Sequence, residues 1–494
     1  MKKELSLLLA ISVFTGLLAS CGSDSPNVTD TEVTFAQTTV EENKSNLPEK
    51  NFGGEVFTLL SQTQSTVAWS TTIFTSEEQN GDVINDEIFK RNSLCMDKYG
   101  FGIEVVEGGG ADETRQTVVQ SILADDQTYN AVLCGYQQQA ATASEGLYAD
   151  VFGVPYLEPD RDIWDEAILN DLAIGGVSYL LTGDLILTDN DCVYTMIYNK
   201  SLADDLKVDG QKFYESVRDG KWTWDMLESY CKDVTTDLNG DSTLDYNDRW
   251  AILANLNDGS GDCNNAFIIA SDTRYFETTG DSLKFLPDAE KFLDITDRIS
   301  RFLSPESGYA ISYSGGTYPG LTARQAIVTW FNNKQALFLA QVMSAGAQYM
   351  RDCDVDFGYL PMPKADENQA SYLSHVDSRC PVLSIPIVNK NVELAGFALE
   401  ALCENSDALV KSYYETCFSS KYTRDEESYE MLLLATENRR YDMGIAFNFG
   451  GVRTSVNEAI KQGGQIASVI ESIRPVVEES VKNFLDVVKG NSAS

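Results

Sequence analysis

The alternation of apolar runs between residues 55 and 134 is the feature that most narrows the fold of this chain. Residues 55–60 and 103–106 predict strands, and Asp82 can cap the helix that lies between them. A second helix at 112–124 and a short buried strand at 131–134 follow. Strands that alternate with helices over short connections are typical of right-handed βαβ units in a parallel sheet. The chain is therefore predicted to be an α/β protein.

The chain has 494 residues and is too long for one ordinary core. Two domains are therefore expected. Its local patterns predict two β-rich runs at 179–188 and 192–198, and the C-terminal third is predicted to be largely helical. Further helices are expected at 224–234, 289–302 and 391–403, and further strands at 335–340, 357–360 and 382–387.

The N-terminal residues resemble an export signal. Lys2 and Lys3 precede an apolar stretch that is too short for a membrane span, and Leu18-Ala19-Ser20-Cys21 resembles a bacterial lipobox. We therefore expect a signal peptide at 1–20 and a lipid on Cys21, with an ordinary signal peptide as the alternative. Residues 21–50 are poor in large apolar side chains and are expected to form a flexible tether.

Charge and cysteine content exclude several classes of protein. The formal net charge of −38 argues against binding nucleic acid or an anionic membrane through charge. No further apolar run is long enough to anchor the chain in a membrane. Besides Cys21 there are nine cysteines without metal-ligand spacing, so a structural zinc site is not expected and few or no disulfides are expected.

Five segments in this order resemble the family 1 extracellular solute-binding proteins, which are the sugar-binding components of ABC importers. Each motif is weak alone, but the order, the spacing and the lipobox together make a specific resemblance over nearly all of the chain after residue 50. Asn333 and Leu337 depart from the family pattern, so the ligand is not carried over from any one relative. The segments are LCMDKYGFGIE at 94–104, YNKSL at 198–202, KWTWDML at 221–227, FNNKQAL at 331–337 and FGYLPMP at 357–363.

The resemblance implies a two-lobed, type II periplasmic-binding-protein-like fold that closes on its ligand about a hinge. Lobe 1 is expected to comprise 51–188 plus 331–381, and lobe 2 to comprise 189–330 plus 382–490 and to be rich in helices. The chain would cross between lobes near 184–191, 330 and 382. The implied function is capture of a carbohydrate, an oligosaccharide in particular, for an ABC permease by a lipid-anchored monomer on the extracellular face of the cell membrane.

An acidic loop at 237–248 predicts a structural calcium site. Its oxygen-bearing residues stand at alternating positions, as Ca²⁺ coordination by six to eight oxygens requires. The loop departs from the EF-hand pattern at Ser242 and Asp248, and a solvated acidic turn is the alternative. The expected ligands are Asp237, Asn239, Asp241, Thr243, Asp245 and Asp248.

Sugars are held by aromatic faces and by planar polar side chains, and this chemistry selects the candidate cleft residues. Trp69 follows the first strand, where a parallel sheet presents its ligand-facing loops. Trp330 stands near an expected crossing, and three aspartates flank the first crossing. Packing residues and solvated loop carboxylates are the alternatives. The candidates are Trp69, Asp184, Asp189, Asp191, Tyr313 and Trp330.

Enzymatic chemistry finds little support in the sequence. There is no GxSxG elbow, no HExxH and no phosphate-binding loop, and His375 is the single histidine. A glycosidase needs two positioned carboxylates, and the 75 acidic residues supply accidental pairs. The protein is therefore predicted not to be an enzyme. The alternatives are a secreted glycan-active enzyme and a surface glycan-binding lipoprotein that is not coupled to import.

Overall fold

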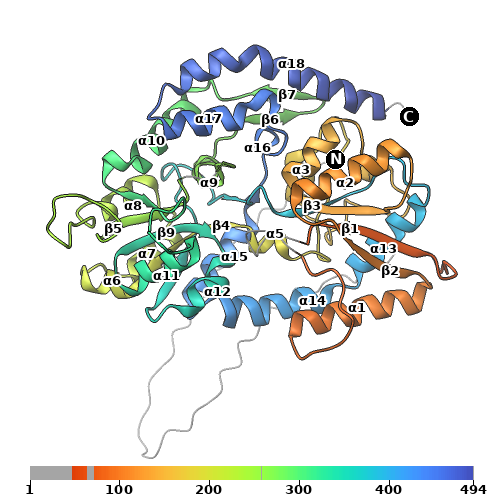
Figure 1. The fold of residues 1–494 in the computed structure, drawn as a ribbon, viewed down its shortest axis with the longest axis horizontal. Helices are drawn as coiled ribbons and strands as arrows, with labels where there is room; N and C mark the ends of the chain where they lie inside the picture. Colours follow the sequence, from red (N-terminus) through yellow and green to blue (C-terminus); the bar gives the residue numbers. More distant parts are fainter. Residues whose placement is uncertain (1–46, 64–71, 257–258, 493–494) are drawn as a thin grey trace, which may run out of the picture. The chain divides into compact units, whose positions relative to one another are not determined.

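Two main sheets organise the computed structural model, which describes residues 47–63, 72–256 and 259–492 (Figure 1). The first sheet has the strand order β12-β3-β1-β2, and the second has the order β10-β4-β9-β5-β8. The predicted signal peptide, Cys21 and the tether to residue 46 lie outside the described residues. From Leu47 onward the chain forms one compact unit.

The first sheet contains the three parallel strands that the sequence predicts. β1 (Val56–Ser61) lies between β2 (Gly102–Glu107) and β3 (Ala131–Gly135) and is parallel to both. β12 (Pro381–Ser384) adds to β3 in the antiparallel direction. β3 and β12 are buried along their whole length, as expected of strands covered on both faces.

Local signals explain the helices that connect these strands. Asp82 accepts hydrogen bonds from the amides of Ile84 and Asn85 and so caps α1 (Val83–Tyr99), while Gly100 ends that helix with φ of 66°. α2 (Ala111–Ala124) and α3 (Tyr136–Ser144) follow β2 and β3. The predicted βαβαβ order is therefore confirmed.

The second sheet gathers strands from distant parts of the chain. β4 (Tyr194–Asn199) pairs with β9 (Ala336–Val342) and β10 (Phe357–Leu360) in the antiparallel direction. β5 (Trp250–Ala254) is parallel to β9 and to the edge strand β8 (Ala310–Ser312). β4, β9 and β5 are buried along their whole length, as expected of strands covered on both faces.

Helices that pack around the second sheet bury its aromatic residues. Thr223 caps α8 (Trp224–Cys231), and the flanking Trp222 and Trp224 are completely buried. The indole of Trp222 donates to the carbonyl of Pro361 at 2.9 Å, and that of Trp224 donates to Ser271 Oγ at 2.8 Å. Both tryptophans are therefore packing residues.

Further helices and strands lie before β12 in the sequence, between the strands of the two main sheets. They are α4 (Glu166–Leu172), α5 (Thr188–Asp191), α6 (Lys200–Asp205), α7 (Gln211–Arg218), α9 (Asp262–Ala270), β6 (Phe276–Thr279), β7 (Ser282–Phe285), α10 (Glu290–Leu303), α11 (Ala323–Asn332), α12 (Ala345–Gln348) and β11 (Ser374–His375).

After β12 the chain is almost entirely helical, as predicted. The elements are α13 (Val392–Glu404), α14 (Asp407–Ser412), the π-helix η5 (Tyr413–Tyr422), α15 (Glu426–Glu437), β13 (Arg439–Arg440), α16 (Met443–Phe447), α17 (Val452–Lys461) and α18 (Ile466–Ser492). In the described part of the chain, no helix is both long enough and apolar enough to cross a membrane.

The strand pairing differs from the predicted division of the chain between the lobes. β9 and β10, from the segment 331–381, belong to the second sheet with β4, whereas β12 and α13, from 382–490, pack on the first. Residues near 330 do not cross between sheets, since α11 leads into β9. The predicted β-rich run at 179–188 makes only isolated bridges and ends in α5. Strand partners depend on contacts that local patterns do not encode.

All nine cysteines in the described residues are buried thiols without disulfides. A buried thiol behaves as a small hydrophobic side chain.

Candidate functional site

Two crossing segments run side by side between the sheets. The first spans residues 187–193 and enters β4, and the second spans residues 376–380 and enters β12. The amide of Asp377 donates to the carbonyl of Cys192 at 2.9 Å, and Val193 forms a bridge with Val376. Groups on these segments therefore lie where both sheets meet.

A third connection is made by η5, which continues from α14. α14 packs against α1 beside the first sheet, and α15, which follows η5, packs on β10 of the second (Figure 1). Tyr413 and Tyr422 of η5 both donate phenolic hydrogen bonds to Asp191 Oδ1 on the first crossing. Burial raises the pKa of Asp191 to about 6, and these two hydrogen bonds oppose the increase.

A cavity of about 250 Å³ opens between α1, the first crossing, α12 and η5. Its polar lining includes Asp191 and Gln348, whose Oε1 is buried and has no hydrogen-bond partner among the described residues. The hydroxyl groups of Thr72 and Thr188, which also line it, are hydrogen-bonded at 2.5 Å. Together with aliphatic and tyrosine side chains, these groups suit a small, neutral, hydroxyl-rich molecule.

The second crossing carries a buried ion pair. Arg379 donates two hydrogen bonds to Asp377, from Nε to Oδ1 at 2.8 Å and from Nη2 to Oδ2 at 2.6 Å. Asp377 is completely buried, while the Arg379 side chain is 29% exposed. Burial raises the pKa of Asp377, and the neighbouring guanidinium opposes the increase. The pair links two neighbouring residues of the second crossing.

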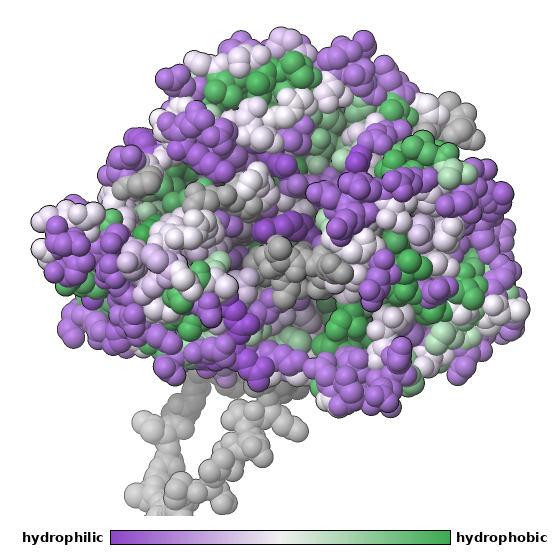
Figure 2. All heavy atoms as spheres, viewed as in Figure 1, coloured by the Kyte–Doolittle hydropathy of each residue, from purple (hydrophilic) through white to green (hydrophobic). Residues whose placement is uncertain are grey.

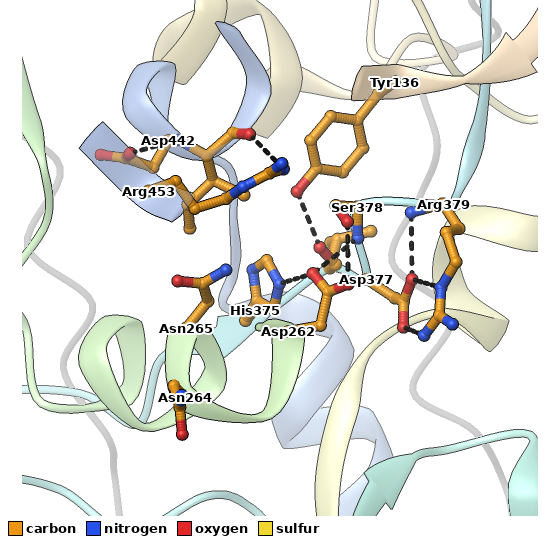
Figure 3. Close-up of polar contacts among 12 residues, drawn as sticks. Tyr136, Asp262, Asn264, Asn265, His375, Asp377, Ser378, Arg379, Asp442 and Arg453 are labelled. Carbon is orange, nitrogen blue, oxygen red and sulfur yellow. Dashed lines mark hydrogen bonds and ion pairs between the residues drawn. The ribbon is translucent and has the colours of Figure 1, made fainter. Parts of the chain in front are cut away.

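Asp262 ties the second crossing to α9 (Figure 3). Its Oδ1 lies 2.9 Å from His375 Nε2 and accepts from the amide of Ser378, and its Oδ2 accepts from Ser378 Oγ at 2.8 Å. Burial would raise the pKa of Asp262, but the hydrogen bond and charge of His375 lower it. A hydrolytic triad needs the serine hydroxyl on the imidazole and open to substrate. Here His375 and Ser378 both contact the carboxylate of Asp262, and all three side chains are buried. The cluster therefore stabilises the fold.

Asp189 on the first crossing and the half-buried Asp184 just before it belong to one group of interacting charges. This group, the hinge cluster, comprises Asp165, Asp184, Asp189, Asn190 and Arg439. Arg439 lies 2.6 Å from Asp165, 2.8 Å from Asn190 Oδ1 and 3.5 Å from Asp189. Burial raises the pKa values of Asp184 and Asp189 to about 7. Neither aspartate lines the 250 Å³ cavity, which only Asp191 of the three reaches.

The three aromatic candidates lie in different parts of the chain. Trp69 lies outside the described residues. Trp330 is completely buried on α11, donates to the carbonyl of Tyr246 at 3.1 Å and packs edge-on against Tyr318. It supports the core beside the acidic loop. Tyr313 follows β8, and its hydroxyl accepts a hydrogen bond from Gln341 at 2.7 Å.

The acidic loop folds through hydrogen bonds from its own backbone. Asp237 accepts from the amides of Gly240 and Ser242, Asn239 from Asp241, Asp241 from Thr243, and Asp248 from Leu238 and Asp245. Asp248 is completely buried, and the other three aspartates are at least partly exposed. Within residues 47–63, 72–256 and 259–492, no three His, Cys, Asp or Glu side chains gather closely enough to hold a metal ion. The donor chemistry suits calcium, but these carboxylates do not converge.

Sequence reasoning missed several residues of the cavity and of the crossings. They are Gln348, Tyr413, Tyr422 and Asp377. Asp377-Ser378-Arg379, a polar triplet between two buried apolar runs, was a usable signal for the second crossing. The sequence contained no signal for the two tyrosines of η5, because their spacing of nine residues fits neither the helical period of 3.6 nor the strand period of 2.

Comparison with known proteins shows similarity in structure alone, since no protein-family model and no curated protein matches the sequence. A galacto-N-biose/lacto-N-biose I-binding protein of an ABC transporter from Bifidobacterium longum, in complex with lacto-N-biose, superposes with a TM-score of 0.55 at 10% identity, covering 88% of this chain and 99% of the other. An extracellular solute-binding protein from Staphylococcus aureus with maltose gives 0.55 at 11% identity, covering 87% and 98%.

A maltose/maltodextrin-binding domain from Bdellovibrio bacteriovorus bound to maltotriose gives a TM-score of 0.53 at 13% identity, covering 86% of this chain and all of that domain. The similarity extends over both sheets and spans these proteins almost completely. The resemblance predicted from the sequence is thus confirmed in the fold. The chain has the two-domain α/β fold of the extracellular solute-binding proteins of ABC transporters.

Proposed function

We propose that this protein is a solute-binding lipoprotein that captures a carbohydrate, an oligosaccharide in particular, and delivers it to an ABC permease. The observation that carries the proposal is the shared fold over 86–88% of the chain with proteins whose structures hold sugars. Because the related structures are binding proteins, capture without chemical conversion is the favoured activity. The cavity beside Asp191 is the proposed contact point for part of the solute.

The chemistry of the cavity agrees with a sugar ligand. Its tyrosine and aliphatic side chains can cover the C–H faces of a sugar ring, and the free Oε1 of Gln348 can accept a hydrogen bond from a hydroxyl group. A volume of about 250 Å³ lies below the roughly 300–1,000 Å³ of pockets that enclose a drug-sized ligand. It suits one ring of a longer sugar.

Thermal unfolding of the compact unit from Leu47, with and without a panel of oligosaccharides, tests this function. A ligand at 100 times its Kd should stabilise the fold by about 2.7 kcal/mol. The expected result is a raised midpoint with one class of sugar and no sugar consumed, as followed by chromatography. Unchanged midpoints with all sugars would refute carbohydrate capture, and release of shorter sugars would replace it by glycan hydrolysis.

We propose further that Cys21 carries the lipid that holds the protein at the extracellular face of the membrane. The support is the Leu18-Ala19-Ser20-Cys21 sequence after an apolar stretch. Mass spectrometry of the mature N-terminus should find a diacylated cysteine at position 21. In a Cys21→Ser variant, the protein should appear in the soluble fraction. A mature N-terminus elsewhere, without lipid, would contradict the anchor.

A structural Ca²⁺ in the acidic loop is proposed on the chemistry of the donor set. The proposed ligands, which supply the oxygens that Ca²⁺ prefers, are Asp237, Asn239, Asp241, Thr243, Asp245 and Asp248. The carboxylates of the loop do not converge in this structure. Ca²⁺ binding would therefore have to bring them together. The loop lies beside Trp250, whose indole donates to the carbonyl of Asp245 at 2.8 Å, so the ion would stabilise this side of the second sheet.

Calorimetric titration with Ca²⁺ after chelator treatment is the direct test. One ion per chain should bind, and Asp241→Asn should weaken it because a charged ligand is lost. Asp97→Asn, an exposed aspartate on α1, serves as the matched control. Heat indistinguishable from dilution, together with an unfolding midpoint that Ca²⁺ leaves unchanged, would identify the loop as a solvated turn.

A further inference from the structure

The winding of η5 decides which of its side chains face the first crossing. Tyr413 and Tyr422 are nine residues apart. In an α-helix of 3.6 residues per turn, nine residues make two and a half turns and place the side chains on opposite faces. The i→i+5 bonding of a π-helix gives about 4.4 residues per turn, so that nine residues make about two turns. Only the π winding puts both tyrosines on one face.

Asp191 is the group that both tyrosines meet. Their phenol groups donate to the same atom, Asp191 Oδ1, and the two rings lie 6.2 Å apart at 80°. Both rings are almost completely buried, as is the Cys417 side chain between them in sequence. Hydrogen bonds to a charged acceptor are stronger than those between neutral groups. An uncommon winding is thus accompanied by two strong contacts that an α-helix could not make together.

The same segment forms one wall of the 250 Å³ cavity. Tyr413, Cys417, Lys421 and Tyr422 all line it, and Lys421 also pairs with Asp82 at the start of α1 at 3.3 Å. If η5 rewound to an α-helix, these side chains would spread around the helix axis. The cavity would then lose its present lining on this side.

We propose that Asp191 is a positioning residue, which holds η5 in its π winding by accepting from Tyr413 and Tyr422 and so shapes the solute cavity. The link to solute affinity rests on the function proposed above, whereas the winding itself does not. This role differs from the direct sugar contact that the sequence suggested. The Oδ1 atom of Asp191 already accepts two protein donors.

Alkylation of Cys417 in the full-length protein, followed by peptide mass spectrometry, reports the winding without any solute. Burial raises the pKa of this thiol to about 11, so the wild type should react slowly at neutral pH. Asp191→Ala should increase labelling of Cys417 about tenfold or more, because the segment loses both contacts. Asp191→Asn keeps an acceptor oxygen and should stay close to the wild type.

Cys231 on α8, a completely buried thiol away from η5, is the internal control in the same digest. Labelling of Cys417 at the wild-type rate in Asp191→Ala would overturn the proposal. So would a joint rise of Cys417 and Cys231, because Asp191 would then support the whole fold. Tyr148→Phe, which removes a phenol bonded to Gln139 beside the first sheet, should leave Cys417 unreactive.

Sugar binding by the same variants tests the effect on the cavity. Asp191→Ala should weaken the best sugar of the panel about tenfold, and Asp191→Asn should restore most of the loss. Equal losses in both variants with unchanged Cys417 labelling would show direct contact and overturn positioning. If the wild type binds no sugar, the proposed function fails, while Cys417 labelling still decides whether Asp191 holds η5.

Discussion

Replacing Asp189 with asparagine probes the charge of the hinge cluster. Asp189 is almost completely buried, and its Oδ1 has no hydrogen-bond partner among the described residues. Burial raises its pKa from the ordinary 3.8 to about 7, while Arg439 opposes the increase. The folded protein therefore binds a proton near neutral pH that the unfolded chain does not bind. Stability must then decrease as the pH rises through the folded value, since the proton is lost.

The magnitude follows from the two pKa values. For one group with a pKa of about 7 in the folded state and 3.8 in the unfolded state, the free energy of unfolding falls by about 1.4 kcal/mol between pH 6 and pH 8. Asp184, with a raised pKa of its own, contributes in the same direction. Asp189→Asn removes one titrating group and should remove about 1.4 kcal/mol of this decrease. The effect should be larger if the charge of Asp189 also raises the pKa of Asp184.

Urea unfolding at pH 6, 7 and 8, followed by tryptophan fluorescence, measures the effect. The wild type should lose stability over this range, and the Asp189→Asn variant should lose less. Asp97→Asn, exposed on α1, is the matched control and should follow the wild type. Parallel curves for wild type and Asp189→Asn would refute the reasoning, because Asp189 would then hold the same charge in the folded protein across this range.

Three further substitutions test other parts of the structure by the same urea unfolding. Arg439→Met leaves Asp165 and Asp189 buried without their cation and should cost about 3–5 kcal/mol, and a loss below about 1 kcal/mol would show that the fold does not depend on this cation. Trp222→Ala should cost about 3–5 kcal/mol through the cavity it leaves, unless the neighbouring aromatic rings collapse into the space. Asp82→Ala removes the cap of α1 and should cost about 1 kcal/mol, and no change would mean that another group replaces it.

The first strands and helices of the chain could be predicted from the sequence because local interactions determine them. Asp82 and Gly100 mark the two ends of α1 because their side-chain and backbone preferences act within a few residues. The apolar runs of β1 and β3 predict buried strands for the same reason. The assignment of β9, β10 and β12 to their sheets was wrong, because each pairs with a strand more than a hundred residues away.

The candidate site was predicted only in part. Asp191 was selected because it flanks the first crossing, and it does line the cavity between the sheets. Asp184 and Asp189 were selected on the same ground, yet neither lines the cavity, and Asp189 pairs with Arg439, a cation 250 residues further along the chain. Gln348 and the tyrosines of η5 carried no signal, since their roles depend on which elements pack around them.

The sequence by itself determined the α/β class, the order of the first strands and helices, and the resemblance that the shared fold confirms. These features follow from periodicity, capping and motif order, which act over short stretches of chain. Only the tertiary structure decided which carboxylate reaches the cavity and which is neutralised by Arg439. It also decided that η5 winds as a π-helix around the contacts of Asp191, because burial and long-range pairing set the charge and direction of a side chain.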